Sequence, residues 1–98
     1  MTVDYALVTK AKMAKRITTD VFDWQIEDLL EAGMKDLQVA GVTIPETCDP
    51  LVEQAVITYF LMRFGEPDEY DRLKRSYDEQ KAQLSTNTGT TTWTEANN

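Results

Sequence analysis

The chain has 98 residues, with 10 basic and 17 acidic side chains, no histidine and a formal net charge of -7. This length predicts a single domain, and the excess of acid argues against a general affinity for nucleic acid or an anionic membrane. The single Cys48 permits neither an internal disulfide nor a CxxC metal site, which is typical of a reducing compartment. We expect no secretory signal, because the N-terminus lacks an apolar core, and no membrane span, because no apolar run approaches ~20 residues.

The first half of the chain predicts two helices. Residues 4–16 have the pattern of a short helix of modest amphipathicity, and a longer helix is expected from about 20 to 40, capped by Thr19 or Asp20 and ended by Gly41. Gly33 lowers the helix propensity of this second helix but allows another helix to approach closely. The apolar residues of the second helix form one stripe: Phe22, Ile26, Leu29, Leu30, Gly33 and Leu37.

A third helix, at about 50–64, is apolar on almost every side. Asp49 suits its N-cap, Pro50 its first position, and Gly65 the left-handed residue after its last turn. Ile57 and Leu61 point away from its main apolar face, so we expect the helix to need cover either from its own chain or from neighbouring chains. Because a chain of this size buries only about 60–65% of its unfolded surface, this requirement favours oligomerisation.

A fourth helix is expected at about 67–84, with Tyr70, Leu73, Tyr77 and Leu84 on one narrow stripe. After Leu84 the composition changes to a threonine-rich run in which Trp93 is the one large apolar residue, and such a run cannot form a core by itself. The predicted fold is therefore all-α: a small bundle of three main helices plus a short N-terminal helix, with a flexible polar C-terminal arm. The helical domain spans 1–84 and the arm 85–98.

The sequence offers little catalytic chemistry. Without histidine the usual base of a hydrolytic triad is missing, there is no glycine-rich phosphate loop, and Cys48 beside a turn is interpreted as incidental rather than nucleophilic. Carboxylates lie mostly opposite the apolar stripe of the second helix and are read as a solvated face: Asp23, Glu27, Asp28, Glu31 and Asp36. We expect a protein that is not an enzyme and that has no cofactor and no metal site.

Charge and aromatic residues are unevenly placed. Residues 1–16 carry four basic and one acidic residue, whereas residues 17–49 carry eight acidic and one basic residue. This asymmetry suits head-to-side contact between identical subunits, although chance segregation of surface charge explains it equally well. Trp24 lies about 180° from the apolar stripe of its helix, so it cannot share that core, and tryptophan is enriched at interfaces.

Two long stretches resemble the small head–tail connector (adaptor) proteins of tailed bacteriophages and prophages. They are "KMAKRITTDVFDWQIEDLLEAGMKDLQVAGV" and "TCDPLVEQAVITYFLMRFGEPDEYDRLKRSYDEQKAQL", which together cover most of residues 10–84. The resemblance rests on a basic short helix ending in "RIT", a "D-x-F-D-x-x-I-x-x-L" helix, a "DPL-x-x-x-A" start, "FG-x-P" and a terminal "SYD". The last 14 residues match no motif of the family.

The resemblance implies a virion structural protein, made in the bacterial host cytoplasm and placed in the neck at the head–tail junction. Family members form rings of about twelve subunits below the portal, prolong the DNA channel, and join the head to a neck, stopper or tail-completion protein. We therefore expect Trp24, Ile57, Leu61 and Trp93 at subunit or portal interfaces. Asp28 and Glu31, with the 43–48 loop, are expected to face the channel, where acid repels passing genomic DNA.

Two other functions remain open from the residues alone. A small helix-turn-helix regulator would use the basic first helix on DNA, but the candidate recognition helix at 20–40 is dominated by acids, whereas such helices carry clustered Arg, Lys, Asn or Gln. A generic acidic helical module that binds other proteins fits the same composition.

Overall fold

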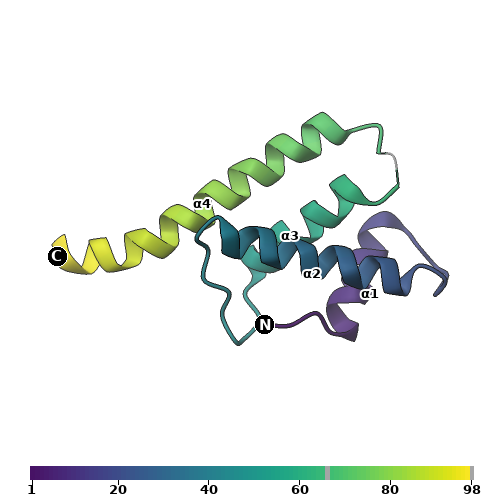
Figure 1. The fold of residues 1–98 in the computed structure, drawn as a ribbon, viewed down its shortest axis with the longest axis horizontal. Coiled ribbons are helices and arrows are strands. Elements are labelled where there is room, and N and C mark those ends of the chain that lie inside the picture. The colour runs from purple at the N-terminus through teal and green to yellow at the C-terminus, as the bar shows by residue number, and fades with distance from the viewer. Residues whose placement is uncertain (66, 98) are drawn as a thin grey trace.

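The computed structural model describes residues 1–65 and 67–85 in full, and the backbone alone of residues 86–97. This part of the chain forms four helices and no strand: α1 (Tyr5–Lys15), α2 (Asp23–Val39), α3 (Pro50–Arg63) and α4 (Tyr70–Asn97). Three main helices preceded by a short one confirm the predicted all-α fold class (Figure 1).

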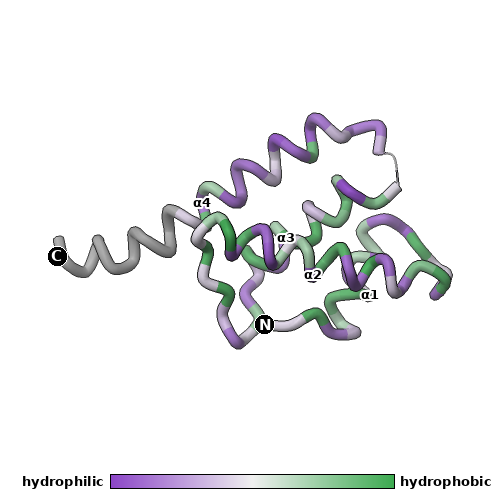
Figure 2. The backbone as a smooth tube through the Cα atoms, in the orientation of Figure 1, coloured by the Kyte–Doolittle hydropathy of each residue, from purple (hydrophilic) through white to green (hydrophobic). Residues whose placement is uncertain are grey.

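The apolar helix α3 lies at the centre of the bundle and packs against all three other helices (Figure 1). Its buried residues are Val52, Ala55, Val56, Thr58, Tyr59, Phe60 and Met62. Ile57 and Leu61, which the sequence leaves without a place in the protomer, are partly buried and pack against this core. The chain itself therefore covers most of α3, and the apolar character of this helix does not by itself require neighbouring subunits. Apolar residues accordingly dominate α3, whereas the first half of α4 is mainly hydrophilic (Figure 2).

The predicted ends of α3 are confirmed. The Asp49 side chain accepts hydrogen bonds from the backbone N–H groups of Leu51 and Val52, which satisfies two of the first amides of the helix. Gly65 follows the helix with φ of 68°, and Gly41 follows α2 with φ of 96°. Both values lie in the left-handed region, where a residue without Cβ has no steric cost.

The predicted start of α2 is wrong by about three residues. The helix begins at Asp23, and its N-cap, Phe22, makes no side-chain capping bond. The Asp20 carboxylate is instead in an ion pair with Lys12 of α1 at 2.8 Å, and Thr19 Oγ1 accepts from the backbone N–H of Val21 within a turn. Both candidate capping groups are therefore occupied before the helix starts.

Gly33 brings α2 and α3 together, as its place in the apolar stripe predicts. A Cβ added at this glycine would lie 3.1–3.2 Å from three atoms of the Tyr59 side chain. Such a separation is shorter than an ordinary contact between carbon atoms. The close approach of the two helices therefore depends on the missing side chain.

Helix α4 is longer than the sequence predicts. Tyr77 and Leu84 of its stripe are buried and Leu73 is partly buried, whereas Tyr70 is 40% exposed. The backbone stays helical to Asn97 rather than ending near Leu84, and the sequence from 68 onward has no proline to stop it. Beyond Ser85, the side chains of the predicted arm, Trp93 included, lie outside the described residues, so the mobility of that arm stays a prediction.

Candidate interaction surface

The most exposed large apolar residue of the described chain, Trp24, lies on the outer face of α2. Ile26 and Leu30 are completely buried against the rest of the bundle, and this fixes the rotation of the helix about its axis. Trp24 consequently points to solvent and is 85% exposed, and Val21, just before the helix, is 80% exposed. Trp24 is therefore exposed, as its position opposite the apolar stripe predicts. Tryptophan is enriched at interface hot spots, and a role of Trp24 in an interface stays a prediction.

Carboxylates share this face with Trp24. At 100° per residue, the directions of Glu27, Asp28 and Glu31 fall within about 60° of Trp24, and all three are exposed. Glu31 lies seven residues further along α2, which is about 10 Å at 1.5 Å per residue. The predicted interface residue and the predicted channel residues thus occupy successive parts of one surface rather than opposite sides of the helix.

Two acids predicted to be solvated are engaged in internal contacts. Asp36 Oδ2 accepts hydrogen bonds from the Tyr77 hydroxyl at 2.5 Å and from Lys81 Nζ at 3.2 Å. The hydrogen bond from Tyr77 is the main reason that the pKa of Asp36 falls below its ordinary value, and burial of the phenol, together with this same hydrogen bond, raises the pKa of Tyr77. Asp23 pairs with Lys12 at 2.9 Å. No local pattern predicts these contacts, because they join α2 to other helices.

The basic first helix is partly neutralised within the molecule. Lys10 forms an ion pair with Glu53 of α3 at 2.7 Å, and Lys12 lies between Asp20 and Asp23. Hydrogen bonding to Asp20 and Asp23 raises the pKa of Lys12, and the same contact lowers the pKa of Asp20. Only two of the four basic residues, Lys15 and Arg16, form no ion pair within the described part of the chain. The basic surface is therefore smaller than the sequence suggests.

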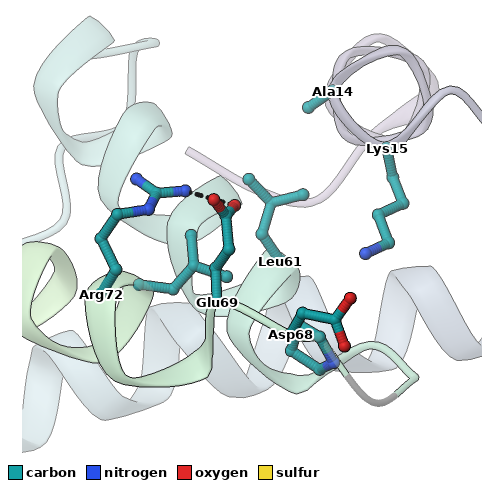
Figure 3. Close-up of a pocket in the computed structure, with 8 residues that line it drawn as sticks. Ala14, Lys15, Leu61, Asp68, Glu69 and Arg72 are labelled. Carbon is teal, nitrogen blue, oxygen red and sulfur yellow. Dashed lines mark hydrogen bonds and ion pairs between the residues drawn. The ribbon is translucent and has the colours of Figure 1, made fainter.

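A groove of about 400 Å³ lies between the end of α1, the end of α3 and the start of α4. Leu61 points into it between Ala14 and Lys15 on one side and the Glu69–Arg72 ion pair on the other (Figure 3). Leu73 also lines this space. Leu61 therefore packs partly on the core and can also be contacted by another molecule through the groove.

The 43–48 loop is held by the start of the chain. The terminal ammonium of Met1 donates to the carbonyl oxygens of Pro45 and Glu46. Cys48 is exposed, and its thiol donates to Glu53 Oε2 at 3.0 Å. This hydrogen bond and the nearby negative charge raise the pKa of Cys48, which lowers its thiolate fraction and hence its reactivity.

The described residues hold no cluster of three or more side chains suited to a metal ion. Among them, no helix is both long enough and apolar enough to cross a bilayer. Comparison of the chain with family models, with curated proteins and with solved structures finds no match.

Proposed function

We propose that this protein is a ring-forming head–tail connector of a tailed bacteriophage or prophage, a virion protein of the neck. In this proposal about twelve copies assemble below the portal by repeated heterologous contact. The ring extends the DNA channel and offers a platform for a neck, stopper or tail-completion protein. Genomic DNA passes through without specific binding, and the protein has no enzymatic role.

The observation that carries the proposal, beside the sequence resemblance, is the composition of the outer face of α2. This face pairs an 85% exposed Trp24 with exposed Glu27, Asp28 and Glu31. An apolar anchor suits contact with another protein, and an acidic surface discourages adhesion of DNA. A connector requires both properties, because it must bind its neighbours firmly and let DNA slide past.

The same observations weigh against a helix-turn-helix regulator. Such a protein needs cations free to meet phosphates, but Lys10 and Lys12 are in ion pairs with acids of the same chain. A recognition helix would also have to present the acidic face of α2 to DNA. A generic acidic interaction module is compatible with the fold, and it differs from a connector in forming no ring.

Imaging of the purified chain tests the proposal. Negative-stain microscopy and native mass spectrometry, performed on the chain alone and with the portal protein of the same phage, should show a ring with a central hole. Retention on heparin at low salt should be absent. If the chain is instead a monomer that does not join the portal and that binds heparin in a salt-dependent manner, the connector hypothesis is wrong and the regulator hypothesis is favoured.

A further inference from the structure

Two features of the surface, a protruding tryptophan and a groove, are complementary to each other. Trp24 on α2 protrudes with 85% of its surface exposed, and a groove lies between α1, α3 and α4. Trp24 is not among the residues that line this groove, so it does not fill the groove of its own molecule. A protruding side chain and a hollow that it leaves empty can form a heterologous contact between identical chains.

The chemistry of the groove suits an indole. The apolar side chains of Leu61 and Leu73 line it, and Ala14 contributes only a small side chain to the lining. A buried tryptophan also needs an acceptor for its N–H group. The Asp68 carboxylate lines the groove and forms no ion pair within the described chain, whereas its neighbour Glu69 is already paired with Arg72 at 2.6 Å. Asp68 can therefore accept the indole N–H.

Charges beside the two features are also complementary. Glu27 is exposed one turn after Trp24, on the same face of α2. Lys15 extends from α1 toward the groove (Figure 3), and Arg16 is exposed next to it. Neither of these two cations has an ion-pair partner among the described residues. Opposite charges set beside an apolar anchor fix the orientation of a contact and speed its formation.

We propose that Trp24 of one copy inserts into the α1/α3/α4 groove of a second copy, with Glu27 of the first facing Lys15 of the second. This inference rests on the proposed ring and names its subunit contact. The contact leaves Asp28 and Glu31, further along α2, available to face the channel. Each copy offers one anchor and one groove, so the contact can repeat from copy to copy, and it closes into a ring where the rotation between neighbours permits.

Disulfide trapping tests the contact even where self-association is weak. One variant carries Trp24→Cys and another carries Ala14→Cys, both in a Cys48→Ser background, and the two are mixed under mild oxidation. The mixed dimer should predominate. The matched control replaces Ala14→Cys by Gln38→Cys, an exposed position at the other end of α2, and should give little mixed dimer. Equal yields from both mixtures, or mainly Trp24→Cys homodimers, would overturn the proposal.

Variants that retain the fold give an independent test. Because Trp24 and Ala14 are exposed, both Trp24→Ala and the groove-filling Ala14→Trp should keep the thermal stability of the parent, and each should weaken self-association at least tenfold. Glu27→Lys and Lys15→Glu should each weaken it, and the double variant should recover it. A loss of portal binding with unchanged self-association would assign the groove to the portal and refute the contact between copies.

The two proposals fail in different ways. If wild-type rings form but the Trp24→Cys and Ala14→Cys pair does not cross-link, the assigned contact is wrong and the connector function stands. If the wild-type chain forms no ring with or without the portal, the connector function itself is wrong.

Discussion

The Tyr77 hydroxyl donates a 2.5 Å hydrogen bond to Asp36 and thereby joins α4 to α2. Tyr77 is only 2% exposed, its ring meets that of Tyr59 edge-on at 5.4 Å, and Lys81 lies 5.1 Å from the centre of the Tyr77 ring. These contacts bring α2, α3 and α4 together at one point. A hydrogen bond to a charged group in a partly buried site is stronger than an exposed one, so this point is a main determinant of how α4 is positioned.

Replacing Tyr77 by phenylalanine should lower the free energy of unfolding by about 1.5–3 kcal/mol, the usual cost of losing a hydrogen bond to a charged group. The ring contact with Tyr59 is kept, so the loss reports the hydroxyl. Chemical denaturation monitored by circular dichroism measures it. Tyr70→Phe is the matched control, because Tyr70 is 40% exposed on the same helix, and an equal loss in both variants would contradict this role of Tyr77.

Asp36 should make the stability of the bundle depend on pH in the acid range. Its pKa in the folded chain lies below the ordinary value of about 4, chiefly because of the hydrogen bond from Tyr77. The ionised group therefore stabilises the fold above pH ~4, and this stabilisation is lost as the pH falls through the folded pKa. Asp36→Asn should be least stable relative to the parent near pH 7, and the difference should shrink below pH ~4.

Denaturation of parent and variant from pH 7 to pH 3 measures this difference. Asp28→Asn is the control, since Asp28 is an exposed residue of the same helix, and its difference from the parent should stay small throughout. A gap between Asp36→Asn and the parent that is constant over the whole range would show that Asp36 acts through packing rather than through charge.

A larger side chain at Gly33 should destabilise the fold. Tyr59 cannot move away easily, because it is held by the Tyr77 ring and by the Arg63 guanidinium, 5.1 Å from the centre of its own ring. Overpacking of a core costs about 1–3 kcal/mol, and the gain in helix propensity over glycine offsets less than ~1 kcal/mol of it. Gly33→Val should therefore destabilise the fold by about 1–2 kcal/mol in thermal or chemical unfolding. Ala32→Val, at an exposed neighbouring position, should cost under ~1 kcal/mol.

Features that depend on local chemistry were predictable from the sequence. The Asp49 cap, the left-handed Gly65, the end of α2 beside Gly41 and the close approach at Gly33 each follow from nearby residues, and each is found as expected. The outward direction of Trp24 follows in the same way, because helical periodicity places it opposite Ile26 and Leu30.

Features that depend on contacts between helices were not predictable. Asp20 forms an ion pair with Lys12 instead of capping α2. Asp36 accepts hydrogen bonds from Tyr77 and Lys81 instead of being solvated. The groove has no sequence signature either, since Ala14, Leu61 and Leu73 come from three helices whose arrangement periodicity alone does not give. Pairing between distant residues is decided by packing, and a single sequence contains no direct signal of it.

Reversing charge on the outer face of α2 tests the channel assignment. Asp28 and Glu31 are exposed, so Asp28→Lys with Glu31→Lys should leave folding and ring assembly intact. Two added cations per subunit would attract the phosphates of DNA, which carries one charge per ~1.7 Å. DNA exit should slow and infectious yield should fall. The neutral pair Asp28→Asn with Glu31→Gln is the control, because it removes the acidic charge without adding a lysine that attracts DNA. A ring structure with both positions on its outer wall would refute the assignment.

Shortening the chain tests the role of residues 85–98. The structure indicates where to cut: Leu84 is buried, and Ser85 Oγ donates to the Ala40 carbonyl oxygen at 2.6 Å, so a chain ending at Ser85 keeps the contacts described for the end of the bundle. Circular dichroism and thermal unfolding of this shortened chain should show an intact bundle with a melting temperature close to that of the parent.

If the removed segment is a binding arm anchored by Trp93, the shortened chain should no longer join the portal. Trp93→Ala in the full chain should reproduce most of this loss, about 2–4 kcal/mol of binding free energy. Wild-type docking by both variants would leave residues 86–98 without a part in assembly, as expected of an ordinary polar terminus.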